Sequence, residues 1–236
     1  MGIKAVFFDL DGTLLPMDQD VFMKAYFSTM AGFMAAYGYE PEKLVKSIML
    51  GSAAMLKNDG TKTNEEVFWN KFSEIYGDKA RLDEPYFNSY YVKCFGKVRE
   101  VCGYTPRARE CQQKALSLGL RTALATNPVF PRIATEMRAA WAGIDINAFE
   151  LVTTYENSFY AKPNINYYKA LLSQMDLLPS EVLMVGNDVS DDMVAKEIGM
   201  KVFLLTDNLI NKDDVDISEY PNGNFDTLIE YIQNII

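Results

Sequence analysis

The chain has 236 residues, of which 49% are hydrophobic and 23% are charged, a composition typical of a folded globular protein rather than a disordered one. Its formal net charge of −9 disfavours a nucleic-acid or anionic-membrane partner, because phosphate groups attract lysine and arginine patches. No apolar run approaches the roughly 18 residues that span a bilayer, so no membrane partner is expected.

The cysteines and the N-terminal residues indicate a reducing compartment. Cys94, Cys102 and Cys111 are odd in number and lack C-x-x-C spacing, which argues against a disulfide framework or a structural zinc site. The first apolar run is short and no basic segment precedes it, so a signal peptide is not expected. We therefore expect a cytoplasmic protein.

The first half of the chain predicts one strand followed by a helical segment. Residues 3–8, IKAVFF, are nearly all apolar, which is typical of a strand buried in a parallel sheet. Residues 18 to about 96 have helical spacing of their apolar side chains throughout. Four helices are indicated. The first ends before Gly38, the second runs from Pro41 to Met55, and the third runs from a Thr63–Glu66 capping box to Gly77. The fourth begins at Pro85, has Tyr86, Tyr90 and Cys94 on one face, and ends at Gly96.

From about residue 104 the pattern changes to alternating helices and apolar strands. Strands are predicted at 122–126, 149–153, 181–185 and 201–205, and helices at 105–119, 131–142, 164–175, 190–198 and 225–236. The acidic segment after Thr206 is predicted to be a solvated loop. Such alternation implies right-handed crossovers and a parallel sheet covered on both faces.

These elements predict an α/β fold, a Rossmann-like doubly wound parallel sheet with an inserted all-helical domain. Residues 1–16 and 99–236 would form the core, and residues 17–98 the helical insert. In such sheets, ligands bind beyond the carboxyl ends of the strands, so the residues that follow each strand matter most for function.

Polar residues follow the predicted strands in a consistent way. They are Asp9 and Asp11 after the first strand, Thr126 and Asn127 after the second, Lys162 in the loop beyond the third, and Asn187, Asp188, Asp191 and Asp192 after the fourth. Singly, each has an ordinary explanation as a turn, a strand-end or a solvated loop residue. For Asp191 we keep such an explanation, a favourable charge at a helix N-terminus. Because the chain has no histidine, carboxylates are the candidates for acid–base chemistry.

The segments DLDGTLL, ATN, AKPN and VGNDVSDD resemble, in order, the four motifs of the haloacid dehalogenase superfamily of phosphohydrolases. The similarity covers the whole chain, and the helical insert corresponds to an α-helical cap. It implies a Mg²⁺-dependent phosphomonoester hydrolase that acts on a small phosphorylated metabolite. Sugar phosphates, phosphoglycolate and nucleoside monophosphates all stay open as substrates, and so does the oligomeric state.

The resemblance also assigns roles to the matched residues. Asp9 would attack phosphorus to form an aspartyl-phosphate, while Asp11 would protonate the leaving oxygen and then activate water. The substrate-binding residues would be Thr126, Asn127 and Lys162. Mg²⁺ would be bound by the Asp9 carboxylate, the Asp11 backbone carbonyl and a distal aspartate.

Two glycines lie beside the residues of this assignment. Gly12 would let the chain turn sharply beside the substrate. Gly186 is followed by Asn187 and then Asp188, whereas the commonest family pattern has an aspartate directly after the glycine. Either Asn187 binds the metal weakly through its amide oxygen, or Asp188 binds it with support from Asp192. Since Mg²⁺ prefers charged oxygen ligands, we predict Asp188 as the metal ligand.

Three alternatives compete with hydrolysis. A sugar phosphomutase would keep all four motifs, whereas a haloacid dehalogenase needs no metal and usually lacks the second aspartate of the first motif. From a different class, a non-catalytic phospho-acceptor or binding protein would share some of these polar residues. Receiver domains of that class have an adjacent acidic pair and no helical insert. The presence of Asp11 favours phosphoryl chemistry over dehalogenation, and the occupied catalytic positions argue against a non-catalytic protein. Transfer back to the substrate would depend on contacts with the cap, and we predict hydrolysis.

Overall fold

The computed structural model describes residues 2–235. Residues 1 and 236, which belong to the predicted core, and residue 236 also to the predicted last helix, lie outside the described part. One sheet has the strand order β3-β2-β1-β4-β5-β6, and all its pairings are parallel. The strands are β1 (Ala5–Phe8), β2 (Arg121–Leu124), β3 (Leu151–Val152), β4 (Val182–Gly186), β5 (Lys201–Leu205) and β6 (Asn222–Gly223).

Helices pack on both faces of this sheet, which confirms the predicted doubly wound α/β fold. Along β1 the side chains alternate: Val6 and Phe8 face one apolar core, and Ala5 and Phe7 face the other. The first core receives α6 (Pro106–Ser117), α7 (Arg132–Trp141) and α9 (Phe225–Asn234). The second receives α8 (Ile165–Gln174) and the 3₁₀ helix η5 (Met193–Ile198). Because β1 is buried on both faces, its sequence is a continuous apolar run.

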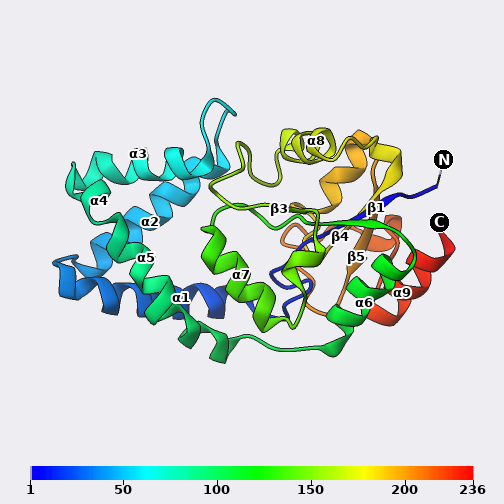
Figure 1. Cartoon of the computed structure of the whole chain (residues 1–236), viewed down its shortest axis with the longest axis horizontal. Coiled ribbons are helices and arrows are strands. Elements are labelled where there is room, and N and C mark those ends of the chain that lie inside the picture. Colours follow the sequence, from blue (N-terminus) through cyan, green and yellow to red (C-terminus); the bar gives the residue numbers. More distant parts are fainter. Residues whose placement is uncertain (1, 236) are drawn as a thin grey trace.

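The chain between β1 and α6 forms a group of helices beside the sheet, which we call the helical block (Figure 1). It comprises α1 (Gln19–Met34), η1 (Ala35–Tyr37), α2 (Pro41–Leu56), α3 (Asn64–Tyr76), α4 (Lys79–Leu82), α5 (Glu84–Lys93) and η2 (Phe95–Val101). The Gly103 N–H donates to the Pro16 carbonyl at 2.7 Å, so the outgoing and returning segments meet. The boundaries at residues 17 and 98, and the function of the block as a cap, stay predictions.

Aromatic contacts join the helical block to one face of the sheet. The Phe22 ring of α1 lies 6.2 Å from the Phe130 ring, and the Phe95 ring lies 5.0 Å from the Trp141 ring of α7. The apolar core on that face is therefore continuous from the sheet into the helical block.

The sequence predicted local helix capping correctly, but its predictions were less accurate where the local pattern was weak. Thr63 and Glu66 form the predicted capping box at the start of α3. Of the residues predicted to share one face of the fourth helix, Tyr90 is buried but Tyr86 is 42% exposed, because Tyr86 stacks on Tyr37 at the surface while Phe87 turns inward. The loop predicted after Thr206 contains β6, whose two polar residues give no strand pattern. The remaining short 3₁₀ helices are η3 (Ile146–Ala148), η4 (Pro179–Glu181) and η6 (Ile217–Glu219).

Candidate active site

Asp9 lies at the carboxyl end of the central strand. It follows Phe8 directly, and its backbone N–H donates to the Val185 carbonyl of β4 at 2.9 Å. A cavity of about 170 Å³ opens at this point, and residues that follow β1, β2 and β4 line it. Five aspartates contribute to the lining: Asp9, Asp11, Asp188, Asp191 and Asp192.

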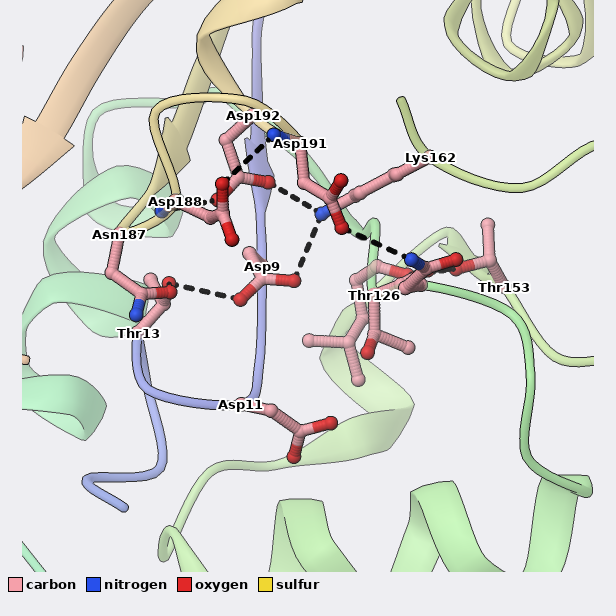
Figure 2. Close-up of polar contacts among 12 residues, drawn as sticks. Asp9, Asp11, Thr13, Thr126, Thr153, Lys162, Asn187, Asp188, Asp191 and Asp192 are labelled. Carbon is pink, nitrogen blue, oxygen red and sulfur yellow. Dashed lines mark hydrogen bonds and ion pairs between the residues drawn. The ribbon is translucent and has the colours of Figure 1, made fainter. Parts of the chain in front are cut away.

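Lys162 joins two of these aspartates (Figure 2). Its ammonium nitrogen lies 2.8 Å from Asp9 Oδ1 and 2.6 Å from Asp192 Oδ1, and the side chain is only 1% exposed. Burial alone would lower the pKa of Lys162, but the carboxylates of Asp192 and Asp9 raise that pKa well above its usual value. Burial also raises the pKa of Asp192 to about 7, against the opposing effect of Lys162. Lys162 is therefore a permanently charged group held against Asp9.

The neighbouring backbone fixes the position of the Asp192 carboxylate. Its Oδ2 accepts a hydrogen bond from the Asp188 backbone N–H at 3.0 Å. A Cβ at Gly186 would lie 2.0 Å from the same oxygen, so only glycine at the end of β4 leaves room for this carboxylate. The structure thus places Asp192 beneath Lys162, where it can orient the ammonium group.

Asn187 uses its amide within the protein. Its Oδ1 lies 2.9 Å from the Thr13 hydroxyl, and its Nδ2 donates to the Asn208 carbonyl at 2.6 Å. Gly12 has a φ of +79°, and a Cβ there would lie 2.3 Å from Asn187 Nδ2. The predicted turn at Gly12 therefore also lets Asn187 pack against the loop that follows β1.

Thr13 was not among the predicted site residues, although it belongs to the first motif. Its hydroxyl lies 2.9 Å from Asp9 Oδ2 as well as from Asn187 Oδ1. A hydroxyl has one proton, so it donates to one of the two oxygens at a time. When the Thr13 hydroxyl donates to Asp9, Thr13 and Lys162 together hold both oxygens of the Asp9 carboxylate.

Asp11 lines the same cavity, but its carboxylate points away from Asp9 (Figure 2). It forms an ion pair with Arg138 of α7, whose side chain is 0% exposed. Burial raises the pKa of Asp11, while the guanidinium opposes this effect. Sequence analysis missed Arg138, although one signal was present: it lies in the buried stripe of α7, four residues after Ala134.

The residues after β2 present polar atoms without partners. Among the described residues, no hydrogen-bond partner reaches the buried Thr126 Oγ1 or Asn127 Oδ1. Asn127 Nδ2 donates to Asp191 Oδ2 at 3.1 Å, and the Thr153 hydroxyl donates to the Thr126 carbonyl at 2.7 Å. Asp191 therefore accepts a side-chain hydrogen bond in the cavity, beyond the role at a helix N-terminus that its position predicted. A buried hydroxyl without a partner can serve a ligand.

The carboxylates suit a magnesium ion only if few of its ligands come from the protein, as the sequence analysis predicted. Among residues 2–235, no group of three or more His, Cys, Asp or Glu side chains is placed to hold a metal. A site with two carboxylates, those of Asp9 and Asp188, and the Asp11 carbonyl needs no third acidic ligand, because Mg²⁺ keeps several waters. Asp188 Oδ1 accepts from the backbone of Ser190 at 2.8 Å and of Asp191 at 3.0 Å. The donor set is all oxygen, which suits this hard cation.

Comparison with known proteins identifies the family. Residues 3–199 match the profile described as haloacid dehalogenase-like hydrolase. The chain belongs to the haloacid dehalogenase-like hydrolase family. The predicted family and the predicted enzyme class, a hydrolase, are confirmed. No helix in residues 2–235 of this hydrolase is long and apolar enough to cross a membrane.

A curated protein and several solved structures are similar to this haloacid dehalogenase-like hydrolase. A ribulose-1,5-bisphosphate 5-phosphatase from Halopiger xanaduensis is 24% identical over 219 residues, or 85% of this chain and 83% of that protein. A HAD phosphatase from Thermococcus onnurineus has a TM-score of 0.59 with 16% identity over 98% of each chain. The L-2-haloacid dehalogenase from Xanthobacter autotrophicus has a TM-score of 0.57 with 16% identity, covering 99% of this chain and 100% of its own. The structural likenesses show the fold alone.

Proposed function

We propose that this hydrolase is a phosphatase that cleaves a small phosphomonoester through an aspartyl-phosphate on Asp9. The observation that carries the proposal is the setting of Asp9, a buried carboxylate at the end of the central strand with both oxygens held by Lys162 and Thr13. A carboxylate fixed in this way can attack phosphorus with little loss of orientation. The phosphatase activity named for the curated relative supports the same reaction.

The reaction would proceed in two displacement steps that use the chain's own residues. In the first, an Asp9 oxygen forms a bond to phosphorus, the ester P–O bond breaks, and Asp11 gives a proton to the departing oxygen. In the second, water attacks the phosphorus of the aspartyl-phosphate, Asp11 takes the proton, and Asp9 and inorganic phosphate are released. Because Asp11 pairs with Arg138, its side chain must rotate toward Asp9 before it transfers a proton.

Three further residues would bind the phosphoryl group. Lys162 would neutralise part of its charge, and the unpartnered Thr126 hydroxyl would donate a hydrogen bond to one of its oxygens. Asn127 would help to position the same oxygens through its amide.

The negative charge of the cavity lining favours a bound cation. Among the described residues that line it, five aspartates stand against one lysine. A dianionic phosphoryl group would be repelled unless further positive charge were present. Mg²⁺, held by the carboxylates of Asp9 and Asp188 and by the Asp11 carbonyl, would supply that neutralisation. A halide leaving group would need neither this charge nor a proton donor, so the cavity supports phosphatase rather than dehalogenase chemistry.

The test is Asp9→Asn in the presence of Mg²⁺. An amide cannot act as the nucleophile, so we expect release of inorganic phosphate from p-nitrophenyl phosphate to fall at least about 10⁴-fold. Acid-quenched wild-type protein should yield a peptide phosphorylated on Asp9. Asp213→Asn, an exposed loop substitution, is the matched control. Wild-type-like turnover by Asp9→Asn, with deamidation excluded by mass spectrometry, would overturn the assignment.

A further inference from the structure

A second cavity, of about 130 Å³, adjoins the active-site cavity. Met23, Val129 and Phe130 line both cavities, so these three side chains form the wall between them. Most of the other lining residues come from the helical block, with Ile48 of α2 and Trp69 of α3 among them, and Pro131 and Tyr155 complete the lining. An ester bound at Asp9 would therefore have this space beside its leaving group.

The lining of the second cavity is uncharged. Among the described residues, no aspartate, glutamate, lysine or arginine contributes to it. Aromatic and aliphatic side chains dominate, including Met30, Phe68 and Phe87. The hydroxyls of Tyr26 and Tyr91, which also belong to the lining, lie 3.0 Å apart, so one donates a hydrogen bond to the other. An apolar group would lose little by entering such a space, whereas a charged group would lose its hydration.

The arginines that contact this lining are already paired with carboxylates. Arg81 lies 5.6 Å from the Trp69 ring centroid and 3.4 Å from Glu84, and Arg138 lies 4.4 Å from the Phe130 ring centroid and pairs with Asp11. An open hollow that shares Met17 and Gln19 with the active-site cavity is lined by Lys212, but Asp18 and Asp20 also line it. Among the described residues that line these two spaces, positive charges therefore do not outnumber negative ones, so neither space favours a second phosphate on the substrate.

We propose that the substrate is a phosphomonoester whose leaving group is uncharged and apolar, of about the size of a benzene ring, and that this group occupies the second cavity. This inference rests on the proposed phosphatase function. Apolar cavities of about 150 Å³ accept benzene, so the volume is suitable. Met23, an unbranched and flexible side chain in the shared wall, can move aside to admit the ring.

The experiment compares ligands that differ only in the apolar group. With Mg²⁺ present, 2-phenylethyl phosphate is compared with ethyl phosphate, because their leaving oxygens have similar basicity. The phosphonates 3-phenylpropylphosphonate and propylphosphonate provide the same comparison for binding without turnover. We expect kcat/KM and affinity to favour the phenyl compounds by roughly tenfold or more. Ribulose 1,5-bisphosphate should be a poorer substrate than 2-phenylethyl phosphate.

Substitutions in the cavity test whether it causes this preference. Ser52→Leu fills part of the space, so the phenyl preference should fall at least about fivefold. Ser28→Leu, on the exposed face of α1, should keep the wild-type preference. Asn88→Trp, at an exposed position of the cavity wall, is a second filling variant in case Ser52→Leu does not fold.

The outcomes separate this inference from the proposed function. A wild-type preference near one, a preference kept in both filling variants, or faster cleavage of ribulose 1,5-bisphosphate would overturn the apolar substrate class while leaving phosphatase activity in place. If no ester releases phosphate, the proposed function fails, and the phosphonate affinities still show whether the second cavity binds apolar groups.

Discussion

The ion pair between Asp11 and Arg138 predicts unequal losses of stability when its partners are removed singly. Asp11→Asn leaves the fully buried Arg138 without its counter-charge, although the hydrogen bonds to the Ala134 carbonyl at 3.2 Å and the Thr135 hydroxyl at 3.3 Å remain. Breaking a buried pair costs roughly 3–5 kcal/mol. Because these contacts remain, we expect Asp11→Asn to lose about 3 kcal/mol of unfolding free energy, near the low end of that range.

Arg138→Met should cost less. Asp11, the partner left behind, has a side chain that is 20% exposed, and burial already raises its pKa, so without Arg138 the carboxylate can take up a proton and lose its charge. We expect a loss of about 1.5–3 kcal/mol, the usual contribution of a hydrogen bond to a charged group. The double variant Asp11→Asn/Arg138→Met removes both charges, so its loss should fall short of the sum of the single losses by about 1–3 kcal/mol.

Urea unfolding of the wild type, the two single variants and the double variant measures this difference. Arg132→Met is a control on the same helix, since Arg132 pairs with Glu136 at 2.7 Å and both side chains are exposed. Its loss should stay below about 0.5 kcal/mol. The reasoning is refuted if the single losses add to within about 0.5 kcal/mol, or if Arg138→Met costs no more than Arg132→Met.

The proposed metal ligand Asp188 and the buried thiol of Cys111 give two more tests. Asp188→Asn should raise the Mg²⁺ concentration for half-maximal phosphate release about tenfold or more, on the order of 1.4 kcal/mol, because an amide is a poorer ligand. Asn187→Ala should change that concentration little, and the opposite pattern in a magnesium titration would assign the ligand to Asn187. Burial raises the pKa of Cys111 to about 12, so almost no thiolate forms near pH 8. Iodoacetamide should modify Cys111 only after unfolding in urea; peptide mass spectrometry showing modification of the native protein would contradict this.

The sequence predicted the residues of the site that depend on strand ends. The apolar run that stops at Asp9 can be recognised from the local sequence alone. Ligands bind at the carboxyl end of such a buried parallel strand, so the run also predicts the place of the site. The same reasoning located Thr126 and the aspartates after β4, and the structure brings them together around one cavity. Their catalytic and binding roles stay proposals.

Partners that lie far apart along the chain were beyond the sequence patterns. Arginine side chains usually lie at the protein surface, and only the packing of α7 against the loop after β1 explains why Arg138 is buried beside Asp11. The contact of Asn187 with Asn208 likewise depends on a loop with no periodic pattern. The segment at 190–198 was predicted to be helical and forms the 3₁₀ helix η5, a distinction that apolar spacing over so few residues does not make.

The position of β1 at the centre of the sheet has a consequence for the order in which the enzyme assembles. β1 is synthesised first, but its neighbours β2 and β4 begin only at Arg121 and Val182. Contacts between such distant segments form slowly, because long stretches of chain must first be brought together. The emerging chain thus carries Asp9, the proposed nucleophile, before β2 and β4 have been made, and it cannot hold Asp9 in place until β4 is present. A chain that stops short of β4 would also lack Lys162's partner Asp192, so activity should appear only with the nearly complete protein.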